Sequence, residues 1–175
     1  MVQAKQKGQV GYLSTDPSLV PWKTLFENLI LPSYLNTSLP KPHKDDVSEL
    51  LKHVGLQKSD LALFPHQLSY GMLHRAMLIR ILLYKPKILL LDELFSGLDE
   101  LTGDFIARVL RDYVKDDISC VLVTHSVRRA SEISDKILIL GYDQNLRPVP
   151  EGVDLREELD IEMNRSLKYR ETRSN

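Results

Sequence analysis

The sequence predicts an α/β protein built around a parallel sheet. Three apolar segments have the length and composition of strands: residues 87–92 (KILLLD), 118–124 (ISCVLVT) and 136–140 (KILIL). Helical patterns at about 99–114 and 126–134 separate them, and such alternation is typical of parallel strands joined by crossover helices. The first segment is an unbroken apolar run, so it should lie centrally in the sheet and be covered on both faces.

The N-terminal part of the chain predicts one more strand and two helices. Residues 9–13 (QVGYL) have the pattern of a short strand. Thr24 is followed three residues later by a glutamate, which is the spacing of a capping box, and Pro32 is expected to end the helix that begins there. A second helix is expected at 44–54, because its apolar residues repeat at helical spacing and Gly55 stands at the usual C′ position.

The C-terminal tail predicts an amphipathic helix. Asp154 and Glu157 have capping-box spacing, and acidic residues precede basic ones along the segment, as the helix dipole favours. Its apolar residues recur at every fourth position: Leu155, Leu159, Met163 and Leu167. We expect this helix to pack on the domain or on a partner.

Composition and charge exclude several classes of protein. A net charge of −1 gives no bulk attraction to a polyanion, so no nucleic-acid partner is expected. Cys120 is the only cysteine, which rules out an internal disulfide and suits a reducing compartment. No apolar run approaches the roughly 20 residues that a membrane-spanning helix needs. The chain is therefore expected to be a cytoplasmic globular protein.

Two adjacent carboxylates end the predicted central strand. Ligands of parallel α/β sheets gather beyond the carboxyl ends of the strands, where Asp92 and Glu93 are expected. There Asp92 can hold a hydrated Mg²⁺, and Glu93 can polarise a water for attack on phosphorus. The alternative is that Asp92 only caps the following turn.

Three further segments can contact phosphate. In LSYGM (68–72), Ser69 opens a buried helix that runs to about Tyr84, so free N–H groups mark an anion site, and Gly71 allows close backbone approach. SGLD (96–99) follows the carboxylates, and His125 ends the next strand. A plain Ser-capped core helix and an ordinary hydrogen-bonded histidine are the alternatives. The phosphate-binding motif GxxxxGK[ST] occurs nowhere in the sequence.

Taken in order, these segments resemble the ATP-binding subunit of an ABC transporter over roughly residues 10–141. DPSLVPWKTLFENL (16–29), read with LSYGM, leans towards the nitrate, sulfonate and taurine importer group. Four segments match the family's motifs. VGYLSTDPSLVPWKTLFENL (10–29) resembles the Q-loop region and the start of the helical subdomain, and LSYGM resembles the signature LSGGQ. ILLLDE (88–93) resembles the Walker B strand with its catalytic Glu, SGLD resembles the D-loop, and His125 matches the switch histidine.

The resemblance implies a P-loop NTPase-like core that is incomplete, because the family's N-terminal Walker A part is missing. It implies four parts: a Q-loop-like segment (1–23), an inserted helical subdomain (24–68), a core with the signature helix, Walker B, D-loop and H-loop (69–141), and a tail helix (142–175).

The resemblance also implies an ATPase with ATP and Mg²⁺ as its ligands. Two subunits of this family sandwich ATP, with Walker A and B of one facing the signature of the other. The implied partners are a second ABC ATPase subunit, identical or different, and transmembrane permease subunits, with the chain on the inner face of the cell membrane. The implied site residues are Glu93 and His125 for catalysis, Ser69, Gly71 and Asp99 for nucleotide binding, and Asp92 for the metal through water.

The sequence departs from the family at four motif positions. Thr15 replaces the Q-loop glutamine, Tyr70 the first glycine of the signature pair, Leu94 the proline after the catalytic Glu, and Ser126 the acid after the switch histidine.

Three functional readings follow from the resemblance. The first is the C-terminal part of an ABC ATPase subunit, with the transported solute left open. The second is a non-catalytic remnant that regulates or supports an intact ATPase. The third is half of an SMC-like DNA-repair ATPase, against which stand PWKTLFENL (21–29) and the absence of long coiled-coil heptads.

Overall fold

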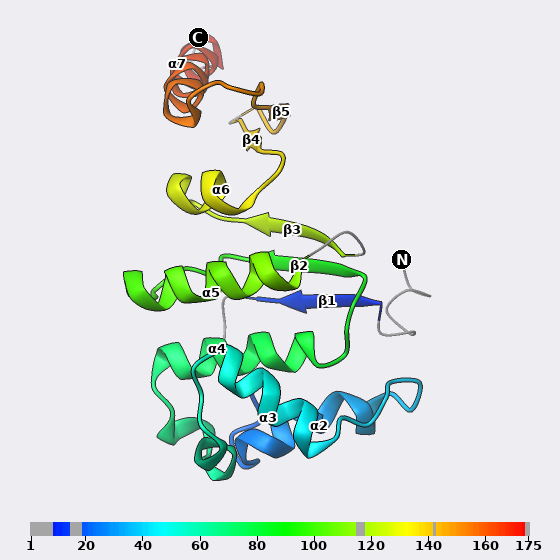
Figure 1. The fold of residues 1–175 in the computed structure, drawn as a ribbon. Helices are drawn as coiled ribbons and strands as arrows, with labels where there is room; N and C mark the ends of the chain where they lie inside the picture. The colour runs from blue at the N-terminus through cyan, green and yellow to red at the C-terminus, as the bar shows by residue number, and fades with distance from the viewer. Residues whose placement is uncertain (1–8, 15–18, 115–117, 142, 174–175) are drawn as a thin grey trace. The chain divides into compact units, whose positions relative to one another are not determined.

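A computed structural model describes residues 9–14, 19–114, 118–141 and 143–173 (Figure 1). The chain divides into two units, Met1–Thr124 and His125–Asn175. Within the described ranges, no helix is both long enough and apolar enough to cross a membrane.

The first unit is built on a parallel sheet of the strands β1 (Val10–Leu13), β2 (Ile88–Asp92) and β3 (Ser119–Val123). Their order among the described residues is β1-β2-β3, and Leu90 is in register with Tyr12 on one side and Val121 on the other. The parallel sheet and the central place of the 87–92 segment are thus confirmed.

The two faces of this sheet differ in burial. On one face Leu13, Leu89 and Leu91 are buried, and α4 (Tyr70–Leu82) packs so closely that a Cβ at Gly11 would overlap the Ile81 side chain. The opposite face is open within the described residues. Its side chains Tyr12, Ile88, Val121 and Val123 are exposed, with Tyr12 at 55% and Val121 at 56%. The expectation that β2 is covered on both faces is therefore wrong for the described part of the chain.

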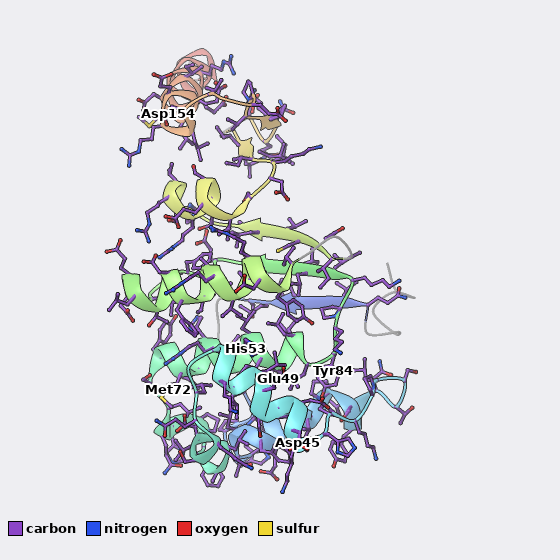
Figure 2. All side chains as sticks on the ribbon, viewed as in Figure 1. Asp45, Glu49, His53, Met72, Tyr84 and Asp154 are labelled. Carbon is purple, nitrogen blue, oxygen red and sulfur yellow. The ribbon has the colours of Figure 1, made fainter. Side chains whose placement is uncertain are left out.

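Helix α2 (Leu25–Leu35) begins as predicted and ends later than predicted. The capping box is present: the Glu27 amide donates to Thr24 Oγ1 at 3.3 Å, and the Thr24 amide donates to Glu27 Oε2 at 2.7 Å. Pro32 lies inside the helix and does not stop it. Tertiary packing outweighs the one hydrogen bond that proline removes, since Leu29 is fully buried and the Tyr84 hydroxyl donates to its carbonyl at 3.1 Å (Tyr84 is labelled in Figure 2).

Helix α3 (Lys44–His53) ends in the predicted glycine cap. Gly55 has φ +66°, its amide donates to the Lys52 carbonyl at 3.2 Å, and the Leu56 amide donates to the Leu51 carbonyl at 2.9 Å. These two bonds are those of a Schellman motif. Two short 3₁₀ helices follow, η1 (Lys58–Ala62) and η2 (Pro65–Gln67).

Two longer helices complete the first unit. Helix α4 (Tyr70–Leu82) is capped by Ser69 and is mostly buried, as predicted for the segment that follows LSYGM. Helix α5 (Glu100–Tyr113) leads from β2 towards β3. The Tyr113 hydroxyl donates to the Leu82 carbonyl at 2.7 Å, which ties the end of α5 to the end of α4.

The second unit contains α6 (Val127–Ile133), β4 (Leu138–Leu140), β5 (Leu146–Pro148) and α7 (Leu155–Arg173). The 136–140 segment does form a strand, but its expected place in the parallel sheet is wrong: β4 pairs antiparallel with β5. The intervening residues reverse the chain, because Gln144 adopts φ +65° and its amide donates to the Gly141 carbonyl at 2.9 Å.

The predicted C-terminal helix is present, but its apolar side chains are not all packed. Leu155 is buried, whereas Met163 is 60% exposed. The residue before Met163, Glu162, is buried instead. Its Oε1 accepts a hydrogen bond from Nη1 of Arg147 in β5 at 2.8 Å. Leu167 lies outside the described side chains.

Candidate nucleotide site

The chain leaves the central strand through a residue with left-handed backbone. Glu93 follows Asp92, the last residue of β2, and has φ +50°. Its amide donates to the Val123 carbonyl at the end of β3 at 3.0 Å, so the first carboxylate beyond the strand is anchored to both strands. A left-handed conformation costs a residue other than glycine about 1–2 kcal/mol, and such residues cluster at functional sites.

The SGLD turn connects these carboxylates to α5. The Ser96 amide donates to the Glu93 carbonyl at 2.9 Å, and Gly97 has φ +70°. Asp99 caps α5: its carboxylate accepts from the Thr102 amide at 2.9 Å and from the Thr102 hydroxyl at 2.7 Å. These bonds lower the pKa of Asp99, because they favour its ionised form. Its described contacts are those of a helix cap, and its role towards a nucleotide stays a prediction.

The LSYGM segment forms the start of α4. Ser69 Oγ accepts from the Met72 amide at 3.3 Å (Met72 is labelled in Figure 2), and Ser69 itself is exposed. A Cβ built on Gly71 would lie 3.5 Å from Thr102 Cγ2, an ordinary contact distance. The chain's own packing therefore leaves room for a side chain at Gly71, and the helix N-terminus offers N–H groups to an anion.

The structure brings LSYGM and SGLD together within the first unit. The Tyr70 ring lies against Gly97, where a Cβ would be 3.0 Å from Tyr70 Cε1. The same ring contacts His74, with ring centroids 4.3 Å apart. His74 is fully buried and was not singled out from the sequence, because a histidine inside an apolar helix carries no distinctive pattern.

Arg75 is a charged residue within the largely apolar helix α4. In the structure its Nη1 donates to the carbonyls of Val54 and Gly55, both at 3.2 Å, and its Nε donates to the Gly71 carbonyl at 3.1 Å. This side chain joins the end of α3 to the LSYGM segment. Sequence alone could not find this connection, because the Val54 and Gly55 carbonyls are about 20 residues away along the chain.

The structure does not test the site roles of the remaining predicted residues. Thr15 lies outside the described residues. His125 is the first residue of the second unit, and its proposed contact with phosphate stays a prediction. Ser126 caps α6 by accepting from the Arg129 amide at 3.3 Å, so it has a local structural role.

Comparison with known proteins identifies the family. Residues 2–96 match the family model described as ABC transporter. The chain belongs to the ABC transporter family. This confirms the resemblance to that family, and LSYGM and ILLLDE lie inside the matched residues.

Among curated ABC proteins, the chain is 36% identical over 137 residues to the aliphatic sulfonates import ATP-binding protein SsuB 1 of Pseudomonas aeruginosa (strain UCBPP-PA14), covering 78% of this chain and 53% of that protein. It is 36% identical over 126 residues to the nitrate import ATP-binding protein NrtC of Synechocystis sp. (strain ATCC 27184 / PCC 6803 / Kazusa), covering 70% of this chain and 19% of that protein. The chain spans about half the length of the sulfonate import proteins that it matches.

Among solved structures, the chain resembles the ATP-binding cassette MJ0796 in a dimeric post-hydrolysis state bound to ADP and Pi. The TM-score is 0.68 at 26% sequence identity, covering 78% of this chain and 60% of that one. The α/β fold class with its parallel sheet is thus confirmed as that of an ABC cassette.

Asp92 offers one carboxylate at the end of β2 as a ligand for the Mg²⁺ that is typical of ABC ATPases. In the described part of the chain, no group of three or more His, Cys, Asp or Glu side chains could form a metal cage. Mg²⁺ is usually held by one or two carboxylates, with waters and substrate phosphates as its other ligands. A single carboxylate at the strand end is consistent with an ion held through water and nucleotide.

Proposed function

We propose that this chain is the part of an ABC ATPase that carries the signature and Walker B, and that it couples ATP hydrolysis to solute import. One observation carries the proposal: in a member of this family, the two adjacent carboxylates Asp92 and Glu93 end the central parallel strand, and Glu93 is held in a left-handed conformation. Ligands of such sheets bind beyond this edge.

Each residue of the site has a proposed role. Glu93 orients and polarises the attacking water, and Asp92 holds Mg²⁺ through a water ligand. Ser69 and Gly71, at the start of α4, bind the γ-phosphate of a nucleotide carried by a partner. His125 contacts the γ-phosphate on this chain's own side, and Asp99 lies at the dimer interface. Mg²⁺, when bound, neutralises charge on the phosphates.

In this proposal the phosphate cradle comes from another segment of polypeptide. The motif GxxxxGK[ST] occurs nowhere in the sequence, so we propose that such a segment provides the Walker A loop. The partners we propose are a second ABC ATPase subunit and transmembrane permease subunits on the inner face of the cell membrane. Support comes from the dimeric state of the MJ0796 cassette and from the import function of the sulfonate and nitrate relatives.

ATP-dependent association tests whether Ser69 serves a partner's nucleotide. The chain is mixed with an intact ABC ATP-binding subunit whose own hydrolysis is blocked, and the complex is measured by sedimentation with and without Mg-ATP. Ser69→Ala should weaken the ATP-dependent part of association about tenfold, because it removes a charge-assisted hydrogen bond to phosphate.

Thr24→Ala is the matched control, because Thr24 and Ser69 each cap a helix through an amide at 3.3 Å. Both variants should lose about 1 kcal/mol of helix capping. Only Ser69→Ala should weaken association. Equal weakening by both variants, or by neither, would contradict a nucleotide role for this position and would favour a non-catalytic partner.

A further inference from the structure

Tyr70 makes a contact inside this chain that the family's signature does not predict. The signature LSGGQ, which this segment resembles, has a glycine where this chain has Tyr70. The tyrosine side chain is 45% exposed, so half of its surface is covered by its own chain. Two neighbours provide that cover, His74 on the same helix and Gly97 in the SGLD turn.

His74 packs against the Tyr70 ring. The two ring centroids are 4.3 Å apart at an interplanar angle of 52°. His74 Nδ1 donates a hydrogen bond to the Tyr70 carbonyl at 3.1 Å. His74 is fully buried, so its ring has little freedom to move. Tilted aromatic pairs at this separation are attractive. The Tyr70 side chain is therefore held in place by its own helix.

Gly97 in the SGLD turn is the second neighbour of the Tyr70 ring. A Cβ on Gly97 would lie 3.0 Å from Tyr70 Cε1, 3.4 Å from its hydroxyl and 3.5 Å from Cζ. The edge of the ring thus occupies the space beside the SGLD turn that a side chain at position 97 would need. Helix α5 also lies near the start of α4, since a Cβ on Gly71 would be at the ordinary contact distance of 3.5 Å from Thr102 Cγ2.

The turn needs such support because it begins with a costly backbone conformation. Glu93 has left-handed backbone at φ +50°, which is unfavourable for a residue other than glycine, whereas Gly97 adopts φ +70° without this cost. Two turn amides hold it from within: Ser96 donates to the Glu93 carbonyl at 2.9 Å, and Leu98 donates to the Phe95 carbonyl at a long 3.4 Å. Strained segments persist only when neighbouring groups hold them.

We propose that Tyr70 is a positioning residue that clamps the SGLD turn against the start of α4. The clamp fixes Asp99 at the end of the turn and Glu93 at its beginning relative to Ser69. The contact itself is independent of any ligand. Its consequence for turnover rests on the proposed function, because only an ATPase site would use these residues together.

Hydrogen exchange on the full chain tests the clamp directly. In Tyr70→Ala, the amides of residues 96–99 should exchange about tenfold faster, because local opening of the turn loses a contact. Tyr70→Phe keeps the ring and should stay within about twofold of the unsubstituted chain. Tyr70→Leu covers His74 but is too short to reach Gly97, so it should accelerate the same amides.

Two controls separate a clamp from general destabilisation. The amides of α3 should be unchanged in all three variants, and Tyr34→Ala, which removes an exposed tyrosine of α2, should leave the turn unchanged. No acceleration at 96–99 in Tyr70→Ala and Tyr70→Leu would overturn the proposal, as would equal acceleration in α3. If Tyr70→Ala does not fold, the comparison of Tyr70→Leu with Tyr70→Phe decides.

A kinetic measurement then separates the clamp from the proposed function. In an assembly with an intact ABC subunit, Tyr70→Leu should lower kcat several-fold with KM for ATP unchanged, and Tyr70→Phe should restore kcat. Faster exchange at 96–99 with unchanged kcat would support the clamp and count against the proposed function. Unchanged hydrogen exchange at 96–99 in Tyr70→Leu, together with a lowered kcat, would overturn the clamp but not the proposed function.

Discussion

Glu93 follows the last residue of β2 with φ +50°, and Gly97 repeats the left-handed conformation four residues later. Glycine adopts it freely, whereas glutamate loses about 1–2 kcal/mol. The amide of Glu93 donates to the Val123 carbonyl, so the sheet itself holds the costly residue. At the scale of single residues, the site is thus built from a carboxylate placed by backbone strain and strand pairing.

Tyr113 gives a prediction at the same scale. Its hydroxyl donates to the Leu82 carbonyl, and burial raises its pKa to about 12. An unfolded tyrosine ionises near pH 10, at about its unperturbed pKa. The folded state therefore holds the proton more tightly, and this contribution to stability is complete below pH 10 and is lost as pH rises towards 12.

Tyr113→Phe should cost about 1 kcal/mol in the free energy of unfolding at pH 7, because one hydrogen bond is lost. Urea unfolding between pH 7 and about pH 11.5 should show the difference between the two chains shrinking above pH 10. Tyr34→Phe, at an exposed position, is the control and should change neither the free energy of unfolding nor its dependence on pH. A difference that stays constant with pH would mean that Tyr113 titrates normally.

At the scale of elements, contacts between helices connect α3 to the candidate site. Arg75 on α4 donates to the carbonyls of Val54 and Gly55 at the end of α3 and to the Gly71 carbonyl on its own helix. A positive charge at a helix C-terminus is favourable, and hydrogen bonds from charged donors are stronger than neutral ones. The side chain thereby ties α3 to the proposed anion site.

Arg75→Ala should lower the free energy of unfolding by about 2–3 kcal/mol, since it leaves three carbonyls without this donor. Arg75→Lys should recover only part of the loss, because an ammonium group cannot reproduce the planar fork. Arg108→Ala, at an exposed arginine of α5, is the control. Equal unfolding midpoints for Arg75→Ala and Arg108→Ala in urea would show that the Arg75 contacts contribute nothing.

The elements also show how far the sequence predicts this fold. The capping box at Thr24, the glycine cap at Gly55 and the apolar run 87–92 were recognisable because local chemistry decides each of them. Pro32 and the 136–140 strand were misjudged because distant residues decide: Tyr84 supports the helix that contains the proline, and β5 pairs with β4.

The candidate site likewise contains residues that the sequence predicts and contacts that it does not predict. Asp92, Glu93 and Ser69 stand in motifs whose order along the chain is specific, so the sequence pointed to all three. The contact of Tyr70 with Gly97 and the bonds of Arg75 depend on how α4 packs against a turn and against another helix. Such packing leaves no periodic pattern in the sequence.

At the scale of the whole molecule, the open face of the sheet predicts association. Tyr12, Ile88, Val121 and Val123 present apolar side chains on one face of the first unit. Exposed apolar patches of this kind favour contact with another surface. Val121→Lys should therefore reduce concentration-dependent self-association in sedimentation velocity. Leu101→Lys, at an exposed apolar residue of α5, is the control and should have little effect. A concentration-independent monomer before substitution would contradict this prediction.

The hydrolysis rate of Glu93→Gln in a complemented assembly tests the central claim most directly. The chain is combined with an ABC subunit or segment that provides Walker A, and Mg-ATP turnover is measured for the original chain, for Glu93→Gln and for Glu49→Gln. Glu49 is an exposed glutamate of α3 and is labelled in Figure 2. The account predicts that Glu93→Gln lowers kcat about 100-fold or more, because the carboxylate that polarises water is lost, while Glu49→Gln has no effect. Unchanged turnover in Glu93→Gln would contradict the account.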